Sequence, residues 1–325
     1  MKQVVAGVDI GGTNTLFGLV DSKGKVLAGN RILTSDYTEI SKFIEALSEA
    51  INKLVKKDHD LIGIGIGAPN ANYYKGTIEL APNLPWKGVV PLAELMKKKN
   101  NVPVIVTNDA NAAAVGEMVF GGARKMKNFI VLTLGTGLGS GIVINGEVVY
   151  GHTAFAGELG HTTVVPGGRE CGCGRQGCFE TYASASGLVR TVLQILSETR
   201  QESTLRDLPP SSLTSKIIAE AAAKKDPVAL EALDYTAEML AFGITNAVVF
   251  SSPEAVFLFG GLTKAGDILF KPVREYVDMN IMPVFKGSLK ILPSGIPESN
   301  AAVLGAAALA WNELKKTGSD RVNKK

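Results

Sequence analysis

The sequence predicts an α/β protein with two similar lobes, and two observations support this expectation. An apolar, strand-like run that ends in glycines occurs twice, over Val4–Ile10 before Gly11-Gly12 and over Phe129–Leu134 before Gly135. Between the strand-like runs, apolar residues recur at spacings of three and four, as in helices that pack on a sheet. The length of 325 residues suits two domains or one large duplicated one.

The two halves share the same order of elements. After the first glycine loop we expect strands over 16–20 and 25–28, joined by a turn at 21–24. After the second we expect strands over 142–144 and 147–150, joined by the hairpin dipeptide Asn145-Gly146. The repeated order of strand, glycine loop, strand, turn and strand predicts an internal duplication.

Helices and further strands fill the remaining chain. The expected elements are, in chain order, a helix over 40–55, strands over 61–67 and 104–107, a helix over 110–119, a surface connection over 201–214, helices over 215–224 and 227–251, a strand over 256–259 and a final helix from 301 to about 315.

Composition argues against several classes of protein. The net charge is only +3, from 34 Lys and Arg against 31 Asp and Glu, which does not favour a nucleic-acid partner. No apolar run reaches the ~18 residues of a membrane span. The N-terminus leads directly into a strand pattern without the features of a signal peptide, so we expect a soluble cytoplasmic protein.

The glycine loops are expected to bind an anion. The loop from Asp9 to Thr15 lies between two strands, which excludes a P-loop or a Rossmann fingerprint, because both need a helix behind the glycines. Two such hairpins that face each other across a cleft would hold a polyphosphate through backbone N–H groups and Thr hydroxyls. Asp9 would then hold Mg²⁺. The alternative is that the glycines only make tight turns.

The cysteines form a second candidate site. All three, Cys171, Cys173 and Cys178, lie within eight residues, and His161 lies ten residues upstream. Three thiolates and one imidazole make a tetrahedral zinc site, and four protein ligands leave no open position, so the zinc would be structural. A disulfide is a poor alternative for an odd number of cysteines, whereas three free cysteines in a loop remain possible.

Several motifs together resemble the ROK family of sugar kinases and repressors. They are, in chain order, Asp-Ile-Gly-Gly-Thr (9–13), Ala-Pro-Asn-Leu (81–84), Asn-Asp-Ala-Asn (108–111), Leu-Gly-Thr-Gly-Leu-Gly-Ser-Gly (134–141), Gly-Glu-Leu-Gly-His (157–161), Cys-Gly-Cys-Gly-Arg-Gln-Gly-Cys-Phe-Glu (171–180) and Gly-Gly (260–261). The resemblance implies the actin-like ATPase (ribonuclease H-like) fold with two duplicated lobes and a cleft between them. We place a small N-terminal lobe at 1–115 plus 301–325 and a large C-terminal lobe at 116–300, with the zinc-binding segment at 161–178.

The resemblance also implies phosphorylation of the 6-hydroxyl of a hexose by ATP. Asp109 corresponds to the family's catalytic base, and a carboxylate beside the attacking hydroxyl is what phosphoryl transfer needs. The alternative for Asp109 is a helix N-cap. The family's sugar ligands correspond to Asn108, Glu158, His161 and Glu180, with Asn83 as a weaker candidate. His161 would then contact both zinc and sugar.

The family's ATP contacts correspond to residues of the glycine loops and of a third glycine pair. They are Gly11, Gly12, Thr13 and Asn14 in the first loop, Thr136 and Gly137 in the second, and Gly260 and Gly261 beside the adenosine. The alternative for the third pair is a turn after a core strand. Relatives are commonly homodimers, so we expect one here.

Glucose is the expected sugar, but one sequence leaves other hexoses open: N-acetylglucosamine, N-acetylmannosamine, mannose or fructose. Asn70 stands where the family usually has a glycine, which also bears on the sugar. A sugar-sensing transcriptional regulator is the alternative of another class. Family repressors carry a helix-turn-helix before the first strand, and the expected strand from Val4 leaves no room for one.

Overall fold

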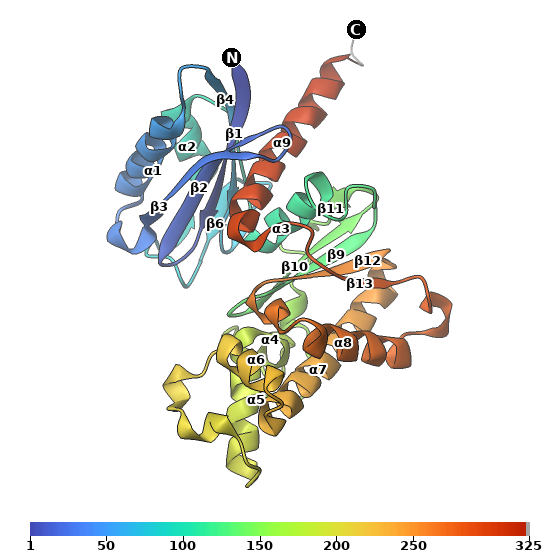
Figure 1. The fold of residues 1–325 in the computed structure, drawn as a ribbon. Helices are drawn as coiled ribbons and strands as arrows, with labels where there is room; N and C mark the ends of the chain where they lie inside the picture. Colours follow the sequence, from blue (N-terminus) through green and yellow to red (C-terminus); the bar gives the residue numbers. More distant parts are fainter. Residues whose placement is uncertain (323–325) are drawn as a thin grey trace. The chain divides into compact units, whose positions relative to one another are not determined.

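The structure is a computed structural model that describes residues 1–322, and the chain divides into two compact units (Figure 1). Unit 1 comprises Met1–Met126, Gly146–Ala156 and the segment from Ser294 onward. Unit 2 comprises Lys127–Asn145 and Gly157–Pro293. The lobe boundaries expected from the sequence, after residue 115 and before residue 301, stay a prediction.

The core of unit 1 is a five-stranded sheet with the order β3-β2-β1-β4-β8. β1 pairs antiparallel with β2 and parallel with β4, and β4 pairs parallel with β8. The strands are β1 (Lys2–Ile10), β2 (Asn14–Asp21), β3 (Val26–Leu33), β4 (His59–Gly67) and β8 (Val104–Thr107).

Helices cover both faces of this sheet. On one face α1 (Ile40–Leu54) and α2 (Leu92–Asn100) bury apolar side chains such as Phe43 against alternate strand residues such as Val8. On the other face α3 (Asp109–Val119) and α9 (Ala301–Val322) pack together, and α9 lies against β1 and β4. Gly7 and Gly65 have no side chain to obstruct α9, because a Cβ at either position would overlap a backbone carbonyl of this helix.

A small second sheet extends unit 1. It has the order β5-β6-β7 and is formed by β5 (Ala71–Asn72), β6 (Thr77–Glu79) and β7 (Val89–Val90). The segment at 146–156 packs beside it: the rings of Tyr73 and Tyr150 stack with centroids 3.9 Å apart, and Asn72 Nδ2 donates to Thr153 O at 3.2 Å.

The second five-stranded sheet, most of which lies in unit 2, repeats the strand order of the first. The order is β11-β10-β9-β12-β13, with β9 antiparallel to β10 and parallel to β12, and β12 parallel to β13. Four of its strands lie in unit 2: β9 (Phe129–Leu134), β10 (Leu138–Ile144), β12 (Ala255–Phe259) and β13 (Lys290–Pro293). The short edge strand β11 (Glu147–Val148) belongs to the segment Gly146–Ala156 of unit 1. Because the strand orders correspond and three pairs of neighbouring strands match in direction, the duplication predicted from the sequence is confirmed.

The helices of unit 2 form a core with this sheet. They are α4 (Glu180–Ala183), α5 (Ala185–Glu198), α6 (Ser215–Ala223), α7 (Pro227–Ser251) and α8 (Asp267–Asn280). Phe179 is fully buried and shares one apolar cluster with Ile130 of β9 and Ile244 of α7. Gly243 of α7 faces the Phe179 ring at a distance that leaves no room for a Cβ.

The structure corrects some expected bounds. β10 begins at Leu138 and not at residue 142, because Gly139 and Gly141 pair with Thr133 and Val131 within the sheet. β11 ends at Val148 and not at residue 150, β3 extends to Leu33, and α9 continues to Val322, beyond the expected end near residue 315.

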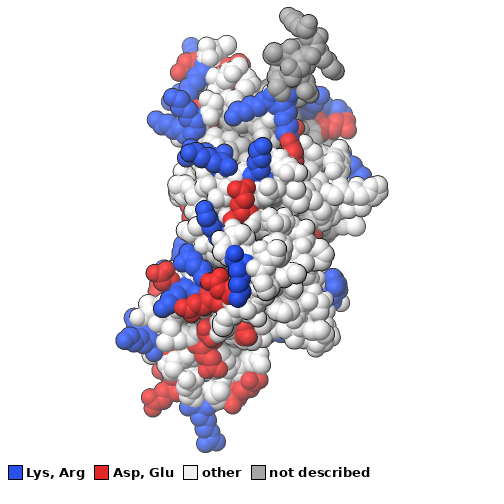
Figure 2. All heavy atoms as spheres, turned by 90° about the vertical axis from the view of Figure 1, so that its right-hand side faces the viewer, with Lys and Arg blue, Asp and Glu red and all other residues white. Residues whose placement is uncertain are grey.

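Two surface properties bear on the class of protein. No helix within residues 1–322 combines the length and the apolar content that a membrane crossing requires. On the face drawn in Figure 2, Lys and Arg side chains lie among Asp and Glu side chains, beside a wide area of uncharged residues.

Candidate active site

The first group of predicted site residues lies at the carboxyl ends of three parallel strands in unit 1. Asp9 of β1 is paired in register with Gly67 of β4, and Gly67 with Thr107 of β8. Asp109 follows Thr107 by two residues and begins α3. This edge of a parallel sheet is where α/β proteins place their ligands.

Asn108 and Asp109 have distinct local roles. Asn108 is the N-cap of α3, and its Oδ1 accepts the N–H of Asn111 at 2.7 Å. The alternative that Asp109 is the cap is therefore wrong, since Asp109 is the first helical residue and its Oδ1 accepts the N–H of Ala110 at 2.9 Å. The cap occupies the amide oxygen of Asn108 and leaves its NH₂ group as a donor.

The two carboxyl groups, Asp9 and Asp109, have perturbed acidity. Burial and, after it, the negative charge of Asp109 raise the pKa of Asp9 to about 7. Burial also raises the pKa of Asp109, although its side chain keeps exposed surface. Two neighbouring carboxylates that are costly to ionise together suit a hard divalent cation such as Mg²⁺. They also provide a basic oxygen for proton transfer.

Gly67 is a member of this group that the sequence reasoning did not single out. A Cβ on Gly67 would lie 3.8 Å from Asp9 Oδ1 and 3.6 Å from the Cα of Asp109, so Gly67 lies beside both acidic residues. The available signal was the glycine that ends the expected strand over 61–67.

The first glycine loop closes the hairpin between β1 and β2, as expected. The N–H of Gly11 donates to Asn14 O at 2.9 Å, and the N–H of Thr34 donates to Thr13 O at 2.8 Å. A Cβ on Gly12 would lie 2.5 Å from Asn83 O, so only glycine fits there. The loop therefore lies against the exposed residue Asn83, whose segment 81–84 was assigned to the sugar by the resemblance.

Asn70 follows β4 in a left-handed conformation, with φ 50°. Glycine adopts this conformation at lower cost, which accounts for the family's preference at this position. Asn70 is exposed, and its Nδ2 donates to Leu80 O at 3.3 Å.

The second glycine loop, Gly135–Gly137, closes the corresponding hairpin in unit 2. Two of its carbonyl groups accept hydrogen bonds from the first residues of α5. The N–H of Ala185 donates to Gly135 O at 2.9 Å, and Ser186 Oγ donates to Thr136 O at 2.7 Å. Thr136 itself is exposed. Neither loop precedes a helix, which confirms that they are not P-loops.

Glu180, the first residue of α4, connects this loop to the cysteine segment. Its Oε2 accepts the N–H of Leu138 at 2.9 Å, and its Oε1 lies 3.8 Å from Cys171 Sγ. A Cβ on Gly137 would overlap Glu180 Oε2. The contact with Leu138 involves a backbone group, and no sequence pattern indicated it.

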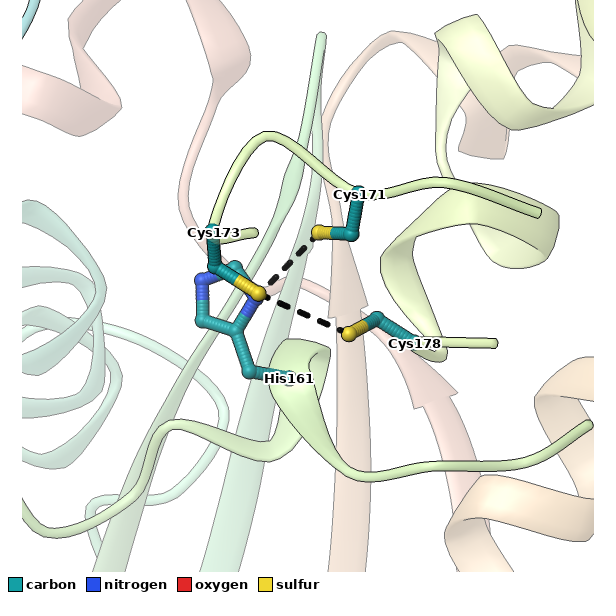
Figure 3. A group of neighbouring side chains, drawn as sticks. All are labelled: His161, Cys171, Cys173 and Cys178. Atoms are coloured by element: carbon teal, nitrogen blue, oxygen red, sulfur yellow. Dashed lines mark hydrogen bonds between the residues drawn. The ribbon is translucent and has the colours of Figure 1, made fainter. Parts of the chain in front are cut away.

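His161 and the three cysteines come together as predicted (Figure 3). His161 Nδ1 lies 3.6 Å from Cys171 Sγ, Cys173 Sγ lies 3.7 Å from Cys178 Sγ, and all four ligand atoms lie within 4.8 Å of one another. Tetrahedral zinc with bonds of ~2.3 Å to sulfur and ~2.0 Å to nitrogen places its ligands ~3.6–3.8 Å apart. The donor set and its spacing therefore fit zinc.

Glycines and arginines shape this zinc segment. Gly174 and Gly177 have φ values of 83° and 74°, which favour glycine. Arg175 donates to His161 O at 3.0 Å. Arg169, which sequence reasoning did not single out, donates from Nη1 to Thr181 O at 2.9 Å and lies over the Tyr182 ring, 4.6 Å from its centroid. Arg169, two residues before Cys171, thus joins the zinc segment to the α4 helix that carries Glu180.

Glu158 precedes the short 3₁₀ turn at Leu159–His161 and is exposed. Ser140 of β10 anchors this turn by donating to Gly157 O and accepting the N–H of Leu159 at 3.1 Å. His161 faces the cysteines with Nδ1, which leaves Nε2 as its other ring nitrogen.

Gly260 and Gly261 lie at the end of β12, next to the end of β9. Gly260 has φ 111°, and a Cβ there would lie 2.6 Å from Leu134 O. Gly261 has no heavy atom within 4 Å of its Cβ position. The carbonyl of Gly260 accepts the N–H of Thr263, which makes a turn after a core strand, and the open side at Gly261 leaves room for a planar ligand.

Comparison with known proteins assigns the chain to a class. It matches the model of the ROK family over residues 5–313, so the protein belongs to the ROK family. The structure matches those of ROK kinases, which have the actin-like ATPase fold. The fold predicted from the sequence is therefore confirmed.

Two relatives and one solved structure are informative. A glucokinase from Halalkalibacterium halodurans is 37% identical over 284 residues, which are 85% of this chain and 86% of the relative. A xylose repressor from Bacillus subtilis is 31% identical over 306 residues, which are 93% of this chain and 76% of the repressor. The structure of a ROK-family glucokinase from Streptomyces griseus in complex with glucose and AMPPNP is 34% identical, with a TM-score of 0.80 over 94% of this chain and 99% of that chain.

Proposed function

We propose that the protein is an ATP-dependent glucokinase that phosphorylates the 6-hydroxyl of glucose. The observation that carries this proposal is the pair Asp9 and Asp109 at the carboxyl ends of the parallel strands in unit 1, with the pKa of both carboxyl groups raised. A sensor that only binds sugar needs hydrogen-bonding groups, whereas a kinase also needs a proton acceptor and a site for the metal ion that accompanies ATP.

Asp109 acts as the catalytic base in this proposal. Its carboxylate accepts the proton of the 6-hydroxyl as the bond between O6 and the γ-phosphorus forms. The bond from the γ-phosphorus to the β–γ bridging oxygen breaks at the same time, and ADP leaves with that oxygen. The raised pKa makes the Asp109 carboxylate a stronger base than one with the ordinary pKa, which favours this transfer.

The nucleotide is held by glycine-loop backbone groups and by Asp9. Asp9, with its raised pKa, is the residue that would hold Mg²⁺, which neutralises charge on the phosphates when it is bound. The phosphates contact Gly11–Asn14 together with Thr136 and Gly137, and the adenosine lies beside Gly260 and Gly261.

Sugar recognition uses polar side chains with defined hydrogen-bonding capacity. The proposed ligands are Asn83, Asn108, Asp109, Glu158, His161 and Glu180. Carboxylates accept sugar hydroxyls, and the free NH₂ group of Asn108 donates to one. His161 and the three cysteines would hold zinc, which would fix the orientation and tautomer of the imidazole.

Similar proteins of the family indicate which substrates and functions to compare. The glucokinases of Halalkalibacterium halodurans and Streptomyces griseus support glucose as the substrate and ATP as the phosphoryl donor. The similarity to a xylose repressor supports a sugar-binding regulator as a second candidate. Asn70 supports testing other hexoses, because its exposed amide replaces a glycine.

The test is a coupled assay for ADP with purified protein, ATP and Mg²⁺. The panel contains glucose, mannose, fructose, N-acetylglucosamine and N-acetylmannosamine, and D109N serves as the control. We expect turnover to be fastest with glucose and nearly lost in D109N. No ADP release with any hexose, combined with sugar binding by calorimetry, would favour the regulator.

Two further parts of the proposal concern the protein's state in the cell. We propose a homodimer, which light scattering coupled to gel filtration tests. We also propose a cytoplasmic location, which fractionation of the source cells tests.

A further inference from the structure

The second glycine loop and the carboxylate of Glu180 are in direct contact within unit 2. Glu180 Oε2 accepts the N–H of Leu138, the residue immediately after Gly137. The same oxygen occupies the space into which a Cβ at Gly137 would project. The Glu180 carboxylate fills the space that a side chain at residue 137 would need. This contact favours glycine at position 137 whether or not the loop binds a phosphate.

From this contact we infer that Gly137 is a positioning residue for the sugar site, although it belongs to the candidate nucleotide loop. The inference rests on the proposed function, in which Glu180 is a sugar ligand. The Leu138 N–H holds one carboxylate oxygen, and the bare Cα of Gly137 allows the carboxylate to approach it. The position of the carboxylate toward the sugar thus depends on the conformation of the loop.

A reciprocal consequence follows for binding. If nucleotide binding moves the Leu138 N–H, the Glu180 carboxylate moves with it, and the affinity for glucose changes. Linkage requires glucose to change the nucleotide affinity by the same factor. Through this contact, the binding of one substrate at the loop or at Glu180 would change the affinity for the other.

The substitution Gly137→Ala tests this inference at small risk to the fold. The backbone of Gly137 has no positive φ, so alanine is not strained there. The atom that it would meet is the end of the flexible Glu180 side chain, which rotates away. Gly135→Ala is a matched control in the same loop, because no heavy atom lies within 4 Å of its Cβ position.

The measurement is the Kd of glucose by calorimetry. Nucleotide is left out, so that an effect of the substitution on ATP binding does not change the measured Kd. We expect Gly137→Ala to weaken glucose binding about tenfold, as the loss of a hydrogen bond to a charged group does. Gly135→Ala should leave the Kd of glucose unchanged. Circular dichroism and zinc content verify that both variants are folded.

A double-mutant cycle provides the second measurement. In the Glu180→Ala background the carboxylate is absent, so Gly137→Ala should cause no further loss of glucose affinity. An equal Kd of glucose in Gly137→Ala and Gly135→Ala, or full additivity with Glu180→Ala, would overturn the inference. These results differ from failure of the proposed function, in which the wild-type protein phosphorylates no hexose.

Discussion

The carboxyl group of Asp9 is close enough to Asp109 for the charge of Asp109 to act on it. Together with burial, which contributes most, this charge raises the pKa of Asp9 to about 7. The register of β1, β4 and β8 brings the two residues together, and Gly67 lies beside both of them. The fold of unit 1 thus brings together the two carboxyl groups that we propose for magnesium binding and proton transfer.

Asp9 should make the stability of the metal-free protein depend on pH. The pKa is about 7 in the folded state and ~4 in an unfolded chain, so the folded state binds more protons between these values. The free energy of unfolding should therefore fall as pH rises from about 4 to about 7 and change little above that. Urea unfolding of wild type and D9N across this range measures the effect, and identical pH profiles would contradict it.

Magnesium should oppose this fall in the free energy of unfolding at higher pH, because it binds the deprotonated carboxylate of Asp9. We expect added Mg²⁺ to raise the melting temperature of the wild type more at pH 8 than at pH 5. D9N, which has no carboxyl group at this position, should respond less at pH 8.

Replacing Asp109 by Asn should separate catalysis from binding. The amide oxygen of Asn still accepts the N–H of Ala110, so α3 should begin normally. We expect kcat to fall by ~10²–10⁴-fold, because the proton acceptor is lost. The Kd of glucose should change far less, because the other proposed sugar ligands are retained. Stopped assays and calorimetry measure the two quantities. The exposed Asp207→Asn is the control, and a D109N turnover near that of wild type would refute the base assignment.

Replacing Cys173 by Ser should weaken zinc retention and raise the KM for glucose. Cys173 is exposed whereas Cys171 and Cys178 are buried, so this change removes a ligand with little loss of packing. We expect zinc to be at least about tenfold easier to remove by a chelator. Colorimetric zinc release provides the measurement, with the exposed Gln176→Ala as the control. Unchanged metal content in Cys173→Ser would argue against four-ligand coordination.

Replacing Arg169 by Met should destabilise the zinc segment. Arg169 donates to Thr181 O, Thr191 Oγ1 and Gln194 Oε1. Its loss leaves the part-buried acceptors Thr181 O and Thr191 Oγ1 without this donor. We expect a loss of about 2–3 kcal/mol in the free energy of unfolding. Arg190→Met, which removes an exposed side chain that donates to Glu170 O, should cost less than about 1 kcal/mol. Equal unfolding midpoints for the two variants would contradict the role of Arg169.

Elements with strong local patterns were predicted closely. The α7 helix spans 227–251 as expected, and α1 ends one residue before its expected end, because regular apolar spacing marks these helices. The zinc segment was also predictable, since its ligands lie close together in the sequence. The structure supports this cluster, and the metal itself stays a prediction.

Other elements lacked such a pattern. The α8 helix has Pro272 in its interior, and proline ordinarily signals the end of a helix. The small strands β5 and β7 have only two residues each, too few for a period to be visible. The start of β10 was assigned to a loop because its glycines suggest turns, although they pair within the sheet.

The sequence alone determined the local features of this protein: two hairpin glycine loops, the amphipathic helices, the cysteine cluster and the motifs that resemble one family. The tertiary structure decided which side chains meet. The neighbourhood of Asp9 and Asp109 depends on strand register, and the bond from Leu138 to Glu180 depends on how α4 packs beside a hairpin. These contacts join residues far apart in the chain, and local periodicity carries no information about such distances.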